Sequence, residues 1–468
     1  MALRWSSLRR PIAAGCALIL AIAAILPTLA VVLPGEALAQ RRGVSLVRDA
    51  EIENTIRAYA VPLLAAAGLT ADSVQVHLVN DRSLNAFVAG GQRIFVHTGL
   101  LQRAEPPAQV IGVLAHEIGH ISGGHLSRLE DSLGNASALM IASMLLGVAA
   151  GVASGNPDAA VAGILAGQQI AERNFLSFTR GQEAAADQAG ANFLDSTQQS
   201  IMGLVEFMKI LANQEALQAD RQDPYVRTHP LSADRVAALT ARAEQSRYAK
   251  VPDNPENIER FKRMQAKLMG YLDGLGATLR KYPESDTSHY ARYARAFAYF
   301  RALDFTRAQT EVNSLIAEFP NDPFYHELKG DILIDMGNVR DALQPHRRAH
   351  ELGPREPLLA YGYARVLVAL EDNSLLPEAV TILKDVVQRE PESSAAWQQL
   401  AIAYGRSGDI GMASLASAER YLIEGALRDA QGQAERAQRL LKEGTPGWLR
   451  AQDVIAAAKD RRREMRNR

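Results

Sequence analysis

The chain has 468 residues, which is too long for one compact core and predicts two or three domains. Hydrophobic residues make up 47% and charged residues 22%, an ordinary globular balance, while sparse aromatics and abundant alanine favour helices over sheets. The formal net charge of −1 gives no electrostatic basis for nucleic-acid binding, and we expect no such partner.

The first 39 residues have the order of a secretory signal peptide. Three arginines precede an apolar run over residues 11–33, and the small-x-small segment 37–39 supplies a cleavage site. We therefore expect residues 1–39 to be removed and the rest of the chain to be exported. The apolar run is also long enough to span a bilayer, so an uncleaved anchor remains the alternative.

The segment after the signal predicts helices and a small sheet. Residues 49–67 have apolar residues at helical spacing, and residues 74–79 alternate as a strand does. Residues 85–88 and 93–96 flank a glycine pair, which is the pattern of a β-hairpin. A helix over residues 107–126 carries the sequence HEIGH.

Residues 136–170 are rich in alanine and glycine and hold one charged residue, Asp158. Asn156-Pro157-Asp158 divides them into two apolar helical pieces, each shorter than the ~20 residues of a membrane span. We favour a buried helical hairpin. The alternative is an apolar flap over the active site, or a segment that touches membrane or unfolded substrate. Further helices are expected over residues 172–194 and 232–247.

The chain changes character after residue 250. Residues 251–262 have the composition of a linker. Beyond them, prolines that close helical pairs are separated by 37, 34 and 37 residues, at Pro283, Pro320, Pro354 and Pro391. A period near 34 is typical of tetratricopeptide repeats, each a pair of antiparallel helices. We expect four repeats over residues 263–445, the last irregular, and a basic helix or tail over residues 446–468.

Small residues support this repeat register. Gly330 stands where the first helix of a pair must let its partner approach closely, and Ala342 and Ala349 lie seven apart on the second helix. Ala379 repeats one of these positions in the next unit, after an insertion near Asn373. Stacked pairs bury a continuous core that no single pair could bury alone.

His116 and His120 of HEIGH lie on one face of their helix, about one turn apart, so both imidazoles can bind one zinc ion. Glu117 projects beside the metal, where it can take a proton from a zinc-activated water and later protonate the leaving amine. A surface helix with histidines in ordinary contacts is the alternative. The apolar residues around the motif instead predict a buried helix, whose histidines and glutamate need partners.

The third metal ligand has two candidates. Leu126 occupies the position at which an extended three-histidine motif needs its last histidine, and His125 is one residue short, an offset of about 100° on a helix. His125 is therefore expected not to bind the metal itself but to lie at the helix end or to contact one of the metal ligands. Glu183 is the natural candidate, and Asp187 one turn later can accept the N–H of a ligating histidine. An ordinary solvated helix face is the alternative for these two acids.

Four separated motifs make the sequence recognisable. They are HEIGH, Arg180-x-x-Glu183-x-x-x-Asp187, Asn85-Ala86-Phe87 with Gly90-Gly91, and Thr228-His229-Pro230 with Arg235. Over roughly residues 49–247 they resemble, in type and order, the HtpX-type and CAAX-prenyl-endopeptidase-related zinc metallopeptidases. The added signal peptide and repeats are similar to the periplasmic branch of that family.

The resemblance implies roles for particular residues. Glu183 would be the third ligand of one zinc ion per chain, and Asn85, Ala86 and Phe87 would form the edge strand to which a substrate peptide adds. His229 would act at the active site, either as a fourth ligand in a latent state or as a stabiliser of the oxyanion. The alternative is that His229 orders the loop before Pro230. Arg235 would hold Glu183 or another acidic group.

We therefore expect a mainly α protein. An α+β zincin-type metallopeptidase domain with a small β-hairpin or sheet, residues 40–250, would precede an α-solenoid of tetratricopeptide repeats. The predicted function is a zinc metalloendopeptidase of the bacterial cell envelope that hydrolyses misfolded or stalled envelope and outer-membrane proteins. Its repeats would bind these clients or the outer-membrane assembly machinery. We expect the basic tail to be a solvated helix end, and peripheral contact with anionic lipid is the alternative. The alternative is a periplasmic chaperone or adaptor with a latent protease site.

Overall fold

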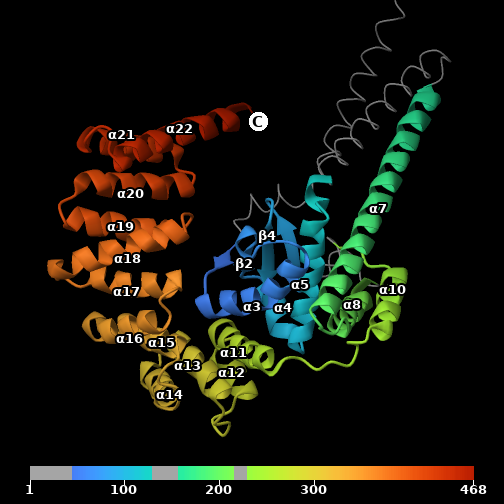
Figure 1. Cartoon of the computed structure of the whole chain (residues 1–468), viewed down its shortest axis with the longest axis horizontal. Helices are drawn as coiled ribbons and strands as arrows, with labels where there is room; N and C mark the ends of the chain where they lie inside the picture. Colours follow the sequence, from blue (N-terminus) through green and yellow to red (C-terminus); the bar gives the residue numbers. More distant parts are fainter. Residues whose placement is uncertain (1–44, 129–156, 216–228, 468) are drawn as a thin grey trace, which may run out of the picture.

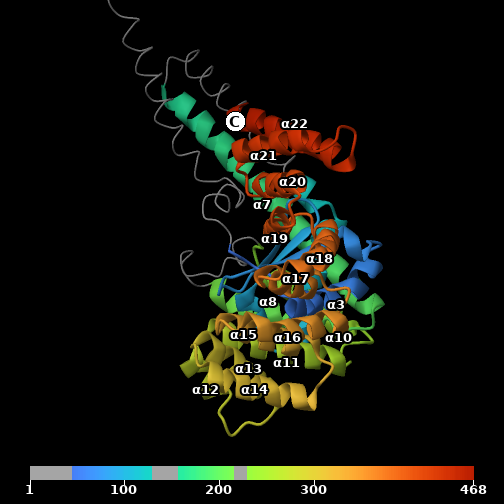
Figure 2. The same ribbon diagram turned by 90° about the vertical axis from the view of Figure 1, so that its left-hand side faces the viewer.

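The computed structural model describes residues 45–128, 157–215 and 229–467. An N-terminal domain, from β1 to α10, combines a small sheet with helices, and a repeat domain, from α13 to α22, follows it (Figure 1). The repeat helices stack as an arc on one flank of the N-terminal domain, whereas α7 projects from the other flank (Figure 1). Turning the molecule by 90° brings the repeat domain in front of the N-terminal domain (Figure 2).

The sheet has four described strands, in the order β1-β2-β4-β3. Their bounds are Leu46–Val47 (β1), Gln75–Val79 (β2), Ala86–Ala89 (β3) and Arg93–His97 (β4). β2 and β4 run parallel, and the other two pairs are antiparallel. The predicted strand and hairpin are confirmed, and β3 lies at the edge of the described sheet. One face of the sheet, with Leu78, Ile94 and Val96, is buried against the helices.

Six α-helices complete the described N-terminal domain. They are Ala50–Ala66 (α3), Thr98–Arg103 (α4), Pro107–Ser122 (α5), Pro157–Ser196 (α7), Met202–Glu215 (α8) and Ala233–Gln245 (α10), with a 3₁₀ turn at Ala71–Ser73 (η2). The side chain of Asp49 caps α3 by accepting the N–H of Ile52 at 2.9 Å, and Ser232 caps α10 in the same way. α5 is the central helix, and nearly all of its residues are buried among α3, α7 and α8.

Two helix bounds differ from the sequence prediction. α5 ends at Ser122, four residues early, because Gly123 and Gly124 follow and Gly124 takes a φ of 61°, a left-handed conformation that ends a helix. α7 runs without a break from Pro157 to Ser196, so the second apolar piece and the helix expected over residues 172–194 are one element. Residues 129–156, with the first apolar piece, lie outside the described residues.

Small residues bring α5 and α7 close together. A Cβ at Gly119 would stand 2.7 Å from the carbonyl oxygen of Ala186, and one at Gly190 would stand 3.0 Å from the carbonyl carbon of Ala115. Both separations are shorter than ordinary van der Waals contacts, so only glycine permits this approach. The backbone of α5 around HEIGH is thereby held directly against the α7 segment that follows Glu183.

Five successive helix pairs form the described repeat domain, rather than the four predicted. Their bounds are His289–Arg301 with Phe305–Glu318 (α13, α14), Pro323–Asp335 with Val339–Leu352 (α15, α16), Pro357–Ala369 with Leu376–Arg389 (α17, α18), Ser394–Arg406 with Ile410–Ile423 (α19, α20), and Leu427–Leu440 with Pro446–Asn467 (α21, α22). The expected tail over residues 446–468 is therefore mostly α22, which packs on α21 through buried Ala451, Val454 and Ala458.

The positions of small residues and prolines in the repeats are confirmed. A Cβ at Gly330 would stand 2.4 Å from the ring of His346 on the partner helix, so α15 and α16 touch at this point. Ala342, Ala349 and Ala379 are fully buried. The insertion near residue 373 is a 3₁₀ turn, Asn373–Leu375 (η3). The four repeat prolines each follow a helix end, as a residue that cannot continue a helix should.

Helices Pro255–Leu272 (α11) and Leu275–Lys281 (α12) join the two domains. Most of the expected linker, residues 251–262, is therefore the start of α11. Phe261, Met264 and Leu268 of α11 belong to the core of the N-terminal domain, while the same helix packs on α13. Along the described part of the chain, no helix is both long and apolar enough to cross a membrane.

Candidate metal centre

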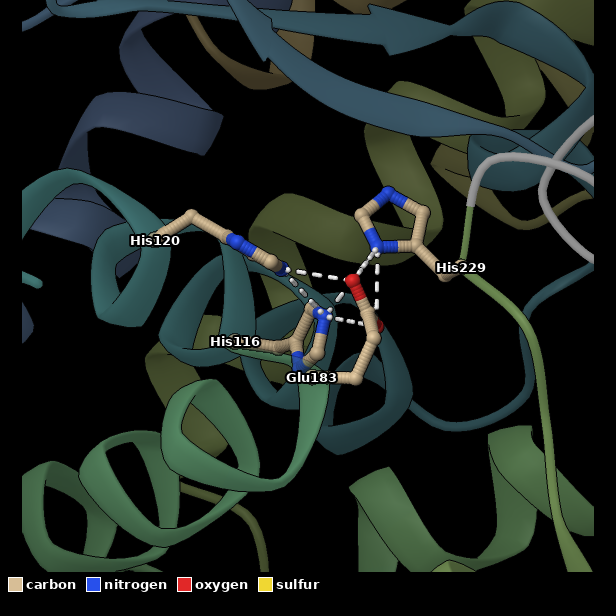
Figure 3. A group of neighbouring side chains, drawn as sticks. All are labelled: His116, His120, Glu183 and His229. Carbon is tan, nitrogen blue, oxygen red and sulfur yellow. Dashed lines mark hydrogen bonds and ion pairs between the residues drawn. The ribbon is translucent and has the colours of Figure 1, made fainter. Parts of the chain in front are cut away.

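Four side chains from three parts of the chain converge at one point of the N-terminal domain (Figure 3). His116 and His120 come from α5, Glu183 comes from α7, and His229 comes from the segment before α10. One nitrogen or oxygen atom of each residue lies within 4.8 Å of the others. His116, Glu183 and His229 are buried, and His120 is nearly so. The sequence prediction named these four residues, and the structure brings them together.

The distances between these atoms suit a tetrahedral metal ion. The Nε2 atoms of His116 and His120 are 3.0 Å apart, and they lie 3.4 Å and 3.3 Å from the oxygens of Glu183. The Nδ1 atom of His229 is 3.3 Å from His116 Nε2 and 3.2 Å from Glu183. Ligands about 2.0–2.1 Å from a tetrahedral zinc ion are roughly 3.3 Å apart. The donor set is therefore of the size and chemistry that zinc requires.

Burial and the close contacts among the charged groups set the protonation of this cluster. Burial lowers the pKa of His120 to about 3, so its imidazole is neutral. Burial would also lower the pKa of His116, but hydrogen bonds to Asp187 and Glu183 outweigh it and raise that pKa to about 10. Burial would raise the pKa of Glu183, yet the three histidines hold it far below its usual range. A carboxylate surrounded by imidazole nitrogens is an arrangement that a divalent cation completes.

Glu117 lies beside the cluster and is completely buried. Its Oε1 is 3.6 Å from His229 Nε2, and within the described residues neither carboxylate oxygen has a hydrogen-bond partner. Burial raises the pKa of Glu117, although His229, His116 and the backbone amide of Val88 in β3 counteract the rise. A buried carboxyl with a raised pKa is suited to accepting and returning a proton.

Asp187 and Arg235 orient the ligands from behind. Asp187 Oδ1 is 2.9 Å from Nδ1 of His116, so this nitrogen donates to the carboxylate and Nε2 faces the cluster. Arg235 donates to both oxygens of Asp187, at 2.8 Å and 3.0 Å, and lies 3.1 Å from Glu183. It also donates to the carbonyl oxygen of Pro230 at 2.7 Å, which ties the His229 segment to the same pair of acids. Sequence reasoning did not foresee this last contact, and no local signal indicates it.

His125 lies behind His120 rather than in the cluster. Its Nδ1 is 3.0 Å from Nδ1 of His120, and its side chain is buried. His120 can therefore donate its Nδ1 proton to His125 while its Nε2 faces the other ligands. This is the helix-end position expected from the one-residue offset.

The predicted substrate edge strand passes the same point. Ala86 and Phe87 lie in β3, and Asn85 immediately precedes it. Asn85 is buried, and its backbone oxygen accepts the N–H of His97 at 3.0 Å. β3 contacts α5, and its Val88 amide is close enough to Glu117 to affect the pKa of that carboxyl. Among the described residues, the unpaired edge of β3 is therefore adjacent to Glu117.

Comparisons with known proteins agree with this geometry. Residues 47–243 match peptidase family M48. The chain is 26% identical over 416 residues to the β-barrel assembly-enhancing protease of Escherichia coli K12, a match that covers 86% of this chain and 82% of that protein. Over a shorter region of 130 residues it is 32% identical to the protease HtpX of E. coli O127:H6, covering 26% of this chain and 41% of the relative.

Among solved structures, a tetratricopeptide repeat protein from Parabacteroides merdae matches at 15% identity and a TM-score of 0.28. The match covers 48% of this chain and 93% of that protein. A TM-score this low carries no argument about function, and the repeat fold rests on the helix pairs described above.

Proposed function

The chain carries a peptidase family M48 domain and is a metalloendopeptidase, and we propose that its metal is one zinc ion held by His116, His120 and Glu183. The observation that supports this proposal most directly is the convergence of three imidazoles and a carboxylate beside the buried carboxyl of Glu117. When bound there, zinc would lower the pKa of water toward neutrality and polarise the scissile carbonyl.

Glu117 is the proposed general base and acid. Its carboxylate would accept a proton from the attacking water and pass that proton to the nitrogen of the leaving amine. Burial, which raises its pKa, makes the carboxyl a better base and keeps it able to return the proton. Asp187 would hold the tautomer of His116, and Arg235 would hold Asp187 and Glu183 in place.

The substrate would bind as an extra strand on the open edge of β3, in which Ala86 and Phe87 lie after Asn85. Support comes from the position of this edge beside Glu117, since a strand paired with β3 brings a peptide bond close to the carboxyl. Backbone pairing gives affinity for any extended chain, which suits an enzyme acting on unfolded proteins.

His229 is proposed to keep the site latent. It stands as close to His116 and Glu183 as those two residues stand to each other, so it could fill a fourth tetrahedral position. Its displacement would free that position for water. A role as oxyanion stabiliser would use the same side chain after it has moved away.

The proposed biological role is quality control in the periplasm, with cleavage of misfolded or stalled envelope and outer-membrane proteins. It is supported by the exported character of the sequence and by the likeness to a protease named for β-barrel assembly. The repeat domain would hold clients or assembly machinery, and stacked helix pairs provide the extended surface for this. The alternative role as a chaperone or adaptor uses the same repeats without cleavage.

Metal content and casein cleavage of the purified protein test this function. We expect about one zinc per chain and cleavage that a chelator stops and added zinc restores. Glu117→Gln should keep the zinc while proteolysis falls by at least about a hundredfold, because only the proton carrier is removed. Absence of zinc from the wild type, or full activity of Glu117→Gln, would contradict the assignment. If Glu117→Gln restores envelope function in a deletion strain, the adaptor role is favoured.

A further inference from the structure

Three aromatic rings form a ladder across the sheet. His77 of β2, Phe95 of β4 and Phe87 of β3 are direct partners in the strand register. The ring centroids of His77 and Phe95 are 5.1 Å apart and those of Phe95 and Phe87 are 5.0 Å apart, with interplanar angles of 23° and 12°. We call these three residues the aromatic ladder. Stacked rings at this separation attract one another beyond simple burial.

The aromatic ladder lies on the sheet face opposite the core. Side chains alternate along a strand, and the neighbours Leu78, Ile94 and Val96 are buried against the helices. The three ladder side chains are only half-buried. Their stacking is therefore not required to fill the core of the domain, and it ends at Phe87 because β3 is the last described strand.

The open edge of β3 would place a substrate directly beside Phe87. Asn85 points its backbone oxygen toward β4, so alternation directs the polar groups of Phe87 toward β4 as well. The N–H and C=O groups of Ala86 and Val88 then point outward, toward an added strand. Facing residues of adjacent strands have Cβ atoms about 5 Å apart, the distance at which rings stack.

We infer that Phe87 selects substrate strands that carry an aromatic residue opposite it, so that the substrate adds a fourth ring to the aromatic ladder. This inference rests on the proposed function and names the substrate class. Because Glu117 lies next to Val88, the selected residue is within about two positions of the cleaved bond, given ~3.3 Å per residue. Strands of transmembrane β-barrels alternate in polarity and carry girdles of aromatic residues, so unfolded segments of this kind fit.

Peptide binding to the full-length Glu117→Gln protein tests the inference without turnover. The probes are two labelled peptides of alternating polarity that differ only in Phe or Ala at one position near the centre. We expect the Phe peptide to bind about three- to tenfold more tightly, the range that aromatic pairs give. Adding Phe87→Ala should remove this preference, and Phe87→Tyr should retain it because the ring remains.

Further variants separate ring stacking from general hydrophobicity and from loss of fold. Phe87→Leu should lose most of the preference, and Phe300→Ala, which removes a ring in the repeat domain, should leave it unchanged. Equal binding of the two peptides, an unchanged preference in Phe87→Ala, or full retention by Phe87→Leu would overturn the inference. Failure of both the wild type and His229→Ala to cleave casein would instead overturn the proposed function, and casein cleavage without a peptide preference would overturn only the inference.

Discussion

At the scale of single residues, His125 contacts the side of His120 that faces away from the proposed metal site. Replacing it with alanine removes the acceptor 3.0 Å from Nδ1 of His120, so this imidazole can rotate and lose its preferred tautomer. We expect the zinc affinity to fall about tenfold, as is typical when such a partner is lost. Competition with a chromogenic chelator measures this directly.

The controls for His125 use one conservative and one distant change. His125→Asn keeps an acceptor near the same position and should recover part of the affinity. His326→Ala removes a histidine of the repeat domain whose ring contacts the carbonyl of Pro320, and it should leave the zinc affinity unchanged. Wild-type zinc affinity in His125→Ala would show that the contact with His120 does not hold the ligand.

How far the site could be predicted depends on whether its geometry is local. His116, Glu117 and His120 follow from helical spacing within five residues of sequence. The spacing of its helix makes Glu183 a candidate, and only the family resemblance predicts it as a ligand, because no local rule brings α7 against α5. The direction of His125 depends on the left-handed turn at Gly124, and this turn exists only once α5 has ended.

At the scale of elements, the contact between α5 and α7 sets the spacing of the proposed metal ligands. Gly119→Ala would push a methyl group to 2.7 Å from the Ala186 carbonyl oxygen, so the helices must separate. We expect a loss of about 1–3 kcal/mol of stability, as for other overpacked sites, together with weaker zinc binding because Glu183 moves away from His116. Urea unfolding of the apo and zinc-loaded proteins measures both effects.

Gly181 on α7 is the matched control, because a Cβ there meets nothing within 4 Å. Gly181→Ala should be neutral or stabilising by up to about 1 kcal/mol, since alanine favours the helix. If Gly119→Ala is as stable as Gly181→Ala and binds zinc as tightly, close helix contact does not position the ligands.

A buried ionic cluster joins α3, α11 and α13. Glu51 is 2.7 Å from Arg263, accepts the Tyr293 hydroxyl at 2.6 Å, and lies 3.3 Å from Lys267, which also contacts Asp49. Burial would raise the pKa of Glu51, but Arg263 and Lys267 outweigh it and lower the pKa. Glu51→Gln removes one carboxylate from each buried cation, which leaves Arg263 paired with Asp322 and Lys267 paired with Asp49, and it should cost up to about 3 kcal/mol near neutral pH.

The loss of stability caused by Glu51→Gln should become smaller as the pH falls. Because the pKa of Glu51 is lower in the folded protein, its stabilisation is present above the unfolded value of about 4.3 and is lost as the pH falls through the folded value. The gap in urea midpoint between wild type and Glu51→Gln should therefore narrow below about pH 4. Glu256→Gln breaks an exposed pair with Arg260 on α11, the helix of Arg263 and Lys267, and its urea midpoint should equal that of the wild type at every pH. A gap that is constant with pH would refute the role of this carboxylate.

The sequence predicts the helices and strands well where the signal is local, and less well where tertiary packing determines the bounds or the pairing of a helix. Residues 49–67 and the hairpin carry clear periodicity and turn glycines. No local sequence signal predicts that α7 is continuous or that α22 pairs with α21. The sequence of an apolar segment or of a basic tail does not show whether another helix covers it. Residues 251–262 have the composition of a linker, because the apolar side of α11 becomes apparent only from Phe261 onward.

At the scale of the whole molecule, two ion pairs fasten the repeat domain to the sheet. Arg48 is 2.7 Å from Glu390, and Arg93 at the start of β4 is 3.2 Å from Glu392. The two glutamates flank Pro391 in the turn between α18 and α19, while the arginines lie more than 290 residues earlier in the chain. No sequence pattern connects such distant charges, so this contact could only be found in the structure.

These exposed pairs should orient the repeat domain more than they stabilise it, since each contributes at most about 1 kcal/mol. Reversing Glu390 and Glu392 to arginine sets like charges against Arg48 and Arg93, which should separate the turn from the sheet. Cleavage of a long unfolded protein should then fall about threefold, because a client held on the repeats is less concentrated at β3. Cleavage of a short peptide, which can reach β3 without the repeats, should stay at the wild-type rate.

A charge-swap cycle decides whether these particular pairs are responsible. Arg93→Glu combined with Glu392→Arg restores opposite charges and should recover the long-substrate rate that each single reversal lowers. Raising the salt concentration should lower the wild-type rate on the long substrate toward the rate of the single-reversal variants. The reason is that salt screens exposed charges, over about 8–10 Å at physiological ionic strength. Equal loss for long and short substrates would mean that the reversals disturb the catalytic domain itself. In that case these two ion pairs would not act by presenting the client to β3.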